Sequence, residues 1–160
     1  KVILCSHMGK PHGIFTEGFG LTKKEKKAVE ALPEAERAAA TEEYLAKAVA
    51  AYDACEGINP SYEFGHIGKG VMFYNYAIEL QEAAANELDD AKYMAIVEKF
   101  ESALMNALAP FEKAFNVCAD NSLKVNIAEY LKNIYYRFYS KGEEFEAGYN
   151  KYNDIVKNGL

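Results

Sequence analysis

Apolar residues recur at steps of three and four over most of the chain beyond residue 60. The longest such run covers residues 93–114 and lasts about six turns, a pattern that only a helix explains. The same spacing predicts helices over residues 64–88, 123–138 and 145–156. Pro110 lies inside the longest run, and we expect it to bend that helix because proline cannot donate a backbone hydrogen bond.

Two further helices are predicted upstream. Thr22 and Glu25 have the spacing of a capping box, which predicts a short basic helix over Lys23–Leu32. Proline is favoured in the first turn of a helix, so Pro33 predicts the start of a helix that runs to about Cys55 and ends at Gly57. The sequence therefore predicts four to five long helices joined by short loops.

The first residues have a different pattern. Val2 to Cys5 form a short, continuous apolar run, and residues 9–20 are rich in glycine. That combination is typical of a buried strand that leads into a linker or binding loop. The predicted fold class is therefore all-α, with a short N-terminal strand and loop.

Composition excludes several classes of function. Half of the residues are hydrophobic, so the chain can bury a sizeable core, and no apolar run approaches the roughly 20 residues that a bilayer requires. The formal net charge of −6 argues against nucleic acid or an anionic membrane as the general partner. The sequence predicts no cofactor, no metal site and no enzymatic activity, because no phosphate-binding loop, nucleophile motif or metal-ligand spacing is present.

The three cysteines, Cys5, Cys55 and Cys118, are far apart in the sequence and form no C-x-x-C pair. They indicate buried free thiols in a reducing compartment rather than a disulfide framework. We therefore expect a cytoplasmic protein. An exported form whose signal has been removed remains an alternative, because the sequence begins at Lys1 without a methionine.

A pattern of small and aromatic residues occurs twice. Its positions are Ala48, Tyr52, Cys55 and Pro60, then Gly70 and Phe73, and again Ala107, Phe111 and Ala114. Small residues at these helical spacings let two helices approach closely, and the aromatic ring fills the space between them. Stacked helical hairpins use this arrangement.

With these positions, residues 42–160 resemble the tetratricopeptide repeat (TPR) family, whereas residues 1–41 form a separate, possibly foreign N-terminal part. The resemblance implies TPR-like antiparallel hairpins stacked into an α-solenoid. It also implies a non-catalytic interaction module whose concave groove takes a peptide or a helix of a partner protein. The resemblance does not identify the partner, and the oligomeric state is left open.

In such stacks the first helix of each hairpin faces the groove. The candidate peptide-binding residues are Asn75, Glu79, Asn126, Tyr130 and Asn133. The last three step by four and then three, so they share one helix face; a polar face that only contacts solvent is the alternative. Tyr135, Tyr136 and Tyr139 also lie close together, and we expect one of them to be exposed and available for binding.

The segment KVILCSHMGKPHG at residues 1–13 resembles the substrate loop of phosphoglycerate kinase. The resemblance implies that His7 and Lys10 bind an anionic, phosphorylated three-carbon substrate, and a cation there suits a carboxylate or a phosphate. The remaining parts of such a kinase are missing from the sequence. The alternative function is thus an incomplete fragment or fusion of that enzyme, inactive alone, and a structural helical domain without a ligand is a third interpretation.

Overall fold

A computed structural model describes the fold of residues 23–160. The helices are α1 (Lys23–Glu30), α2 (Glu34–Ile58), α3 (Glu63–Ala85), α4 (Asp90–Val117), α5 (Asn121–Arg137), the 3-10 helix η1 (Tyr139–Lys141) and α6 (Glu143–Asn158). Every regular element among these residues is helical, which confirms the all-α prediction for this part of the chain. The predicted strand at Val2–Cys5 and the capping residue Thr22 lie outside the described residues.

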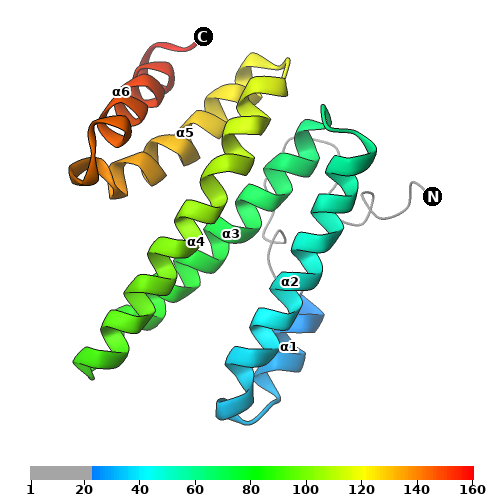
Figure 1. The fold of residues 1–160 in the computed structure, drawn as a ribbon, viewed down its shortest axis with the longest axis vertical. Helices are drawn as coiled ribbons and strands as arrows, with labels where there is room; N and C mark the ends of the chain where they lie inside the picture. The colour runs from blue at the N-terminus through cyan, green and yellow to red at the C-terminus, as the bar shows by residue number, and fades with distance from the viewer. Residues whose placement is uncertain (1–22) are drawn as a thin grey trace.

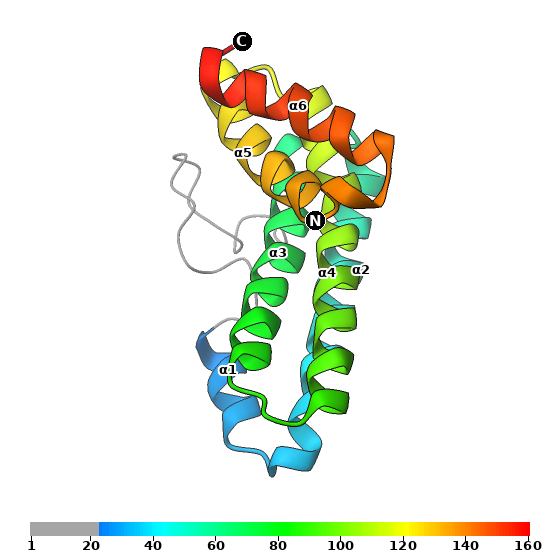
Figure 2. The ribbon, with the colours of Figure 1, turned by 90° about the vertical axis from the view of Figure 1, so that its left-hand side faces the viewer.

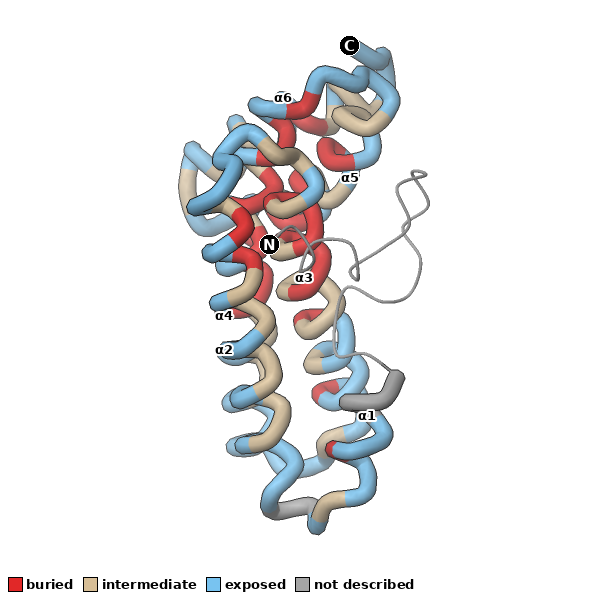
Figure 3. The backbone as a smooth tube through the Cα atoms, turned by 90° about the vertical axis from the view of Figure 1, so that its right-hand side faces the viewer, coloured by how far each residue is buried: buried red, intermediate tan, exposed pale blue. Residues whose placement is uncertain are grey.

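Successive helices pack on one another. The hairpin of α3 and α4 is the longest unit, α2 lies along α3, and the pair α5–α6 packs at one end of the hairpin (Figures 1 and 2). Buried residues are concentrated at that end, whereas the opposite end of the hairpin carries mostly exposed and half-buried residues (Figure 3). The core therefore lies where α3 and α4 meet α5.

The helix ends follow from local hydrogen bonds. Asp89 caps α4 by accepting a bond of 2.9 Å from the Lys92 amide, and Asp120 caps α5 by accepting a bond of 3.0 Å from the Leu123 amide. α4 continues as one element through Pro110, which is buried.

The helix predicted over residues 64–88 ends earlier, at Ala85. The Asn86 and Glu87 amides bond back to Ala83 and Ala84 in a closing turn. The Glu87 side chain then accepts bonds from the amides of Leu88 and Asp89. Leu88, the last residue of the predicted helix, is 97% exposed in this loop, so the predicted end of the helix was wrong.

The predicted boundary between residues 41 and 42 falls inside α2, which runs without interruption from Glu34 to Ile58. The division of the chain at that position remains a prediction. Of the predicted buried thiols, Cys55 and Cys118 are buried, which confirms that expectation for these two.

The central helix α3 contacts its two neighbours through glycine. A Cβ added to Gly68 would lie 2.6 Å from a carbon of the Tyr52 ring on α2, and one added to Gly70 would lie 2.8 Å from the Phe111 ring on α4. Two residues span about 200° of a helix, so the two glycines lie on nearly opposite faces of α3. Gly70 and Phe111, both part of the repeat pattern, thus show an aromatic ring against a small residue, and Gly68 with Tyr52 is a second case whose glycine the pattern did not include.

Helix α6 is attached through aromatic residues. The Tyr135 ring stacks on the Tyr152 ring at a centroid distance of 5.7 Å, and Tyr152 meets Phe115 edge-on at 5.4 Å. Gly148 leaves room for the Tyr135 ring, which any Cβ at that position would strike. The Tyr135 hydroxyl donates a bond of 2.6 Å to Glu112, which anchors the α5–α6 pair to α4.

We predict that Gly70→Ala destabilises the fold. The added methyl would overpack the contact with the fully buried Phe111, at a cost of about 1–3 kcal/mol, against a gain of about 1 kcal/mol in helix propensity. Urea unfolding should therefore show a net loss of up to about 2 kcal/mol. The control is Gly57→Ala in α2, where a Cβ meets no atom within 4 Å, so no loss is expected. Equal unfolding midpoints for the two variants would contradict the close packing at Gly70.

The fold should also weaken in alkali. Burial raises the pKa of Tyr152 to about 12, above the ordinary tyrosine value of about 10. Because the folded state holds this proton more tightly, the contribution of Tyr152 to stability is complete below about pH 10 and is lost as the pH rises toward 12, by at most about 1.4 kcal/mol per unit. Tyr152→Phe should reduce the alkaline slope of the unfolding free energy, measured by urea titration at several pH values. An unchanged slope would contradict the raised pKa of Tyr152 in the folded state.

Candidate functional site

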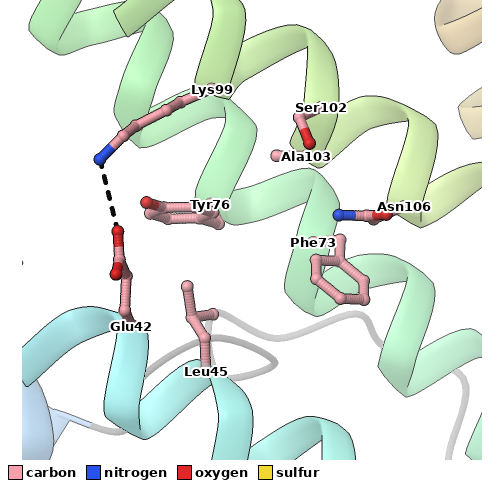
Figure 4. Close-up of a pocket in the computed structure, with 8 residues that line it drawn as sticks. All are labelled: Glu42, Leu45, Phe73, Tyr76, Lys99, Ser102, Ala103 and Asn106. Carbon is pink, nitrogen blue, oxygen red and sulfur yellow. Dashed lines mark hydrogen bonds and ion pairs between the residues drawn. The ribbon is translucent and has the colours of Figure 1, made fainter. Parts of the chain in front are cut away.

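A cleft of about 220 Å³ opens between α2, α3 and α4 (Figure 4). Its lining residues are Glu42 and Leu45 from α2, Phe73 and Tyr76 from α3, and Lys99, Ser102, Ala103 and Asn106 from α4. The two positions on α3 are three residues apart, and those on α4 have the spacing i, i+3, i+4 and i+7. Each helix therefore presents one face to the cleft.

The charges of the cleft belong to one ion pair. Lys99 Nζ lies 3.4 Å from a Glu42 carboxylate oxygen and bridges α4 to α2. The two side chains are 53% and 62% exposed, so the pair contributes little to stability and can be opened at small cost. Burial raises the pKa of Tyr76 above that of an ordinary tyrosine, so its phenol is neutral at pH 7 and stays neutral further into alkali. The cleft therefore offers apolar surface, a neutral phenol and a separable ion pair.

Around Phe73 and Tyr76 the cleft presents mostly apolar side chains. Ser102 and Asn106 are exposed and add hydrogen-bonding groups on the α4 side. Apolar walls with a few polar groups are typical of binding sites.

A second cluster of ionisable side chains lies at the turn between α2 and α3. His66 is 4% exposed, and its Nε2–H donates a bond of 2.7 Å to the Pro60 carbonyl. Its Nδ1 lies 4.0 Å from Glu56, which is paired at 2.5 Å with Lys113 on α4. His66 therefore links the start of α3 to the turn that precedes it and, through Glu56, to α2.

The predicted peptide-binding residues do not line the cleft. Asn75 is half-buried and Glu79 is exposed on α3, and Asn126 and Asn133 are exposed on α5. Tyr130, between the last two, is half-buried. The groove formed by these five residues remains a prediction.

Tyr130 joins α5 to the hairpin. Its ring stacks on Phe111 at 4.8 Å and meets Tyr74 of α3 edge-on at 5.0 Å. The side chain proposed as a binding anchor therefore packs against the core with at least part of its surface.

The three neighbouring tyrosines divide between core and surface differently from the prediction. Tyr135 is half-buried against α6, whereas Tyr136 is 66% exposed and Tyr139 is 37% exposed. The sequence predicted one exposed tyrosine, and the structure shows two. His7 and Lys10 lie outside the described residues, so the predicted substrate-binding pair remains a prediction.

Neither a metal-binding cluster nor a membrane-spanning helix is found among the described residues. Within residues 23–160, no group of three or more His, Cys, Asp or Glu side chains is placed to hold a metal ion. None of the described helices is long and apolar enough to cross a membrane.

Comparisons with protein-family models, curated proteins and solved structures found no match to this chain. The cleft and the exposed side chains are therefore the features of the chain that bear on its function.

We predict that His66→Leu destabilises the fold by about 1 kcal/mol. The leucine side chain still fills the buried position, but it cannot donate the hydrogen bond to the Pro60 carbonyl. The measurement is urea unfolding near neutral pH. The matched control is Lys113→Ala, which breaks the ion pair to Glu56 at a lysine that is 56% exposed and should cost less. A larger loss for Lys113→Ala would contradict this ranking.

Proposed function

We propose that this chain is a helical-repeat interaction module that binds a segment of a partner protein. A single apolar side chain of that segment would enter the cleft between α2, α3 and α4. The observation that carries the proposal is the cleft itself, walled by Leu45, Phe73 and Tyr76. The TPR resemblance supports the same class of function, since such stacks bind extended peptides or helices.

The size of the cleft favours a peptide side chain over a free small molecule. Pockets for drug-sized ligands usually measure about 300–1,000 Å³, and this cleft measures about 220 Å³. A Leu or Phe side chain buried there would contribute about 1.5–3 kcal/mol. The neighbouring Ser102 and Asn106 are placed to bond the peptide backbone on either side of it.

The partner can be replaced by peptides selected from a random linear library displayed on phage. We expect the selected peptides to share one large apolar residue. Ser102→Phe places a ring in the cleft from an exposed position and should weaken these peptides roughly tenfold or more, the effect of one lost apolar anchor. Fluorescence anisotropy with labelled peptides measures the change.

The matched control is Asn116→Phe, which adds a ring at an exposed position of the same helix, about 21 Å farther along its axis. This variant should bind the peptides like the parent. Peptides that bind Ser102→Phe normally but lose affinity for Asn126→Ala and Asn133→Ala would place the site on the predicted α5 face instead. A library that yields no specific binder would contradict the proposal.

A further inference from the structure

Three tyrosine rings gather on the surface where α5, η1 and α6 meet. Tyr149 of α6 is half-buried, and its ring centroid lies 5.4 Å from that of Tyr136 and 5.4 Å from that of Tyr139. The Tyr139 ring stands at 86° to the Tyr149 ring, so the two present an edge and a face. With Tyr136 66% exposed, this tyrosine patch offers aromatic surface to solvent.

Several other aromatic rings carry a cation from the chain itself. Lys47 lies over Tyr44, Lys124 over Phe115, Lys151 over Phe115 and Tyr152, Arg137 over Phe100, and Lys141 over Phe138. Among the side chains that the structure describes, no lysine or arginine lies over a ring of the tyrosine patch. The exposed ring of Tyr136 is therefore open to a cation from another molecule.

The cations nearest in sequence are held elsewhere. Arg137 lies 3.0 Å and Lys141 2.6 Å from the two carboxylate oxygens of Glu101 on α4. Lys132 pairs with Glu129 at 3.6 Å. These contacts draw the positive charge of α5 and η1 away from the three tyrosines.

Carboxylates border the patch. Glu146 accepts a bond of 3.0 Å from the Tyr139 hydroxyl, and Glu143 and Glu144 are exposed in the same first turn of α6. The helix dipole favours negative charge there. None of the three forms an ion pair with a side chain that the structure describes, so this border keeps its negative charge.

We propose that the tyrosine patch binds an arginine side chain of a basic segment in a partner protein. A guanidinium group can stack on an exposed ring while its N–H groups bond a carboxylate, here that of Glu146. The net charge of −6 favours the approach of a basic partner. The patch and the cleft share no residue, so this proposal stands independently of the cleft.

The probe is an acetylated and amidated peptide of alternating glycine and arginine that carries a fluorescent label. Its matched control is the same peptide with citrulline, which keeps the shape of arginine and lacks its charge. At low ionic strength the arginine peptide should bind, and the citrulline peptide should bind roughly tenfold more weakly or not at all. Fluorescence anisotropy measures both.

The variants decide where the peptide binds. Tyr136→Ala combined with Tyr139→Ala should weaken the arginine peptide roughly tenfold, whereas Tyr136→Phe, which keeps the ring, should bind it nearly as well as the parent. Glu146→Gln should weaken it severalfold. Tyr93→Ala removes an exposed tyrosine at the far end of α4 and should change nothing. Circular dichroism checks that each variant is folded.

Three results would overturn the proposal. One is equal binding of the arginine peptide to the parent and to the double alanine variant, which would indicate non-specific attraction to an acidic protein. Another is equal binding of the arginine and citrulline peptides, which would make the patch an apolar contact only. The third is the absence of binding by the parent at millimolar peptide.

Discussion

The packing of α3 between two aromatic rings is the constraint on which the rest of the structure depends. Gly68 and Gly70 let Tyr52 of α2 and Phe111 of α4 lie directly against the backbone of α3. Large side chains follow on α3 within two turns, at Phe73 and Tyr76, and there the three helices border an open cleft. The order of small and large residues along α3 therefore accounts both for the close helix contacts at the glycines and for the cleft beside Phe73 and Tyr76.

Aromatic residues have three different roles in this fold. Phe111 fills the space between helices, Tyr135 attaches α6 and bonds to α4, and Tyr136 contributes its ring to the surface. Tyr135 and Tyr136 are neighbours in sequence and lie about 100° apart around α5, so the position of α6 decides which of them is covered. Both proposed binding surfaces are regions where an aromatic side chain is left partly uncovered by the helix packing.

The helices could be predicted because their apolar spacing is a local property. The repeat pattern also indicated that small residues and aromatic rings meet between helices, but it did not pair Gly70 with Phe111. The cleft could not be predicted in the same way. It depends on the approach of Glu42 on α2 to Lys99 on α4. These residues are 57 positions apart in the sequence, and no local pattern indicates that they meet. The exposed position of Leu88 was missed because hydrogen bonds of the following loop, rather than periodicity, determine where α3 ends.

The most direct test of this account is the nuclear magnetic resonance of the two glycines of α3. If Gly68 and Gly70 lie against aromatic rings, their Hα protons should be shifted upfield by ring currents and should show nuclear Overhauser contacts to the rings of Tyr52 and Phe111, respectively. Shifts typical of a solvated helix, without contacts to these rings, would contradict the packing from which the cleft is derived.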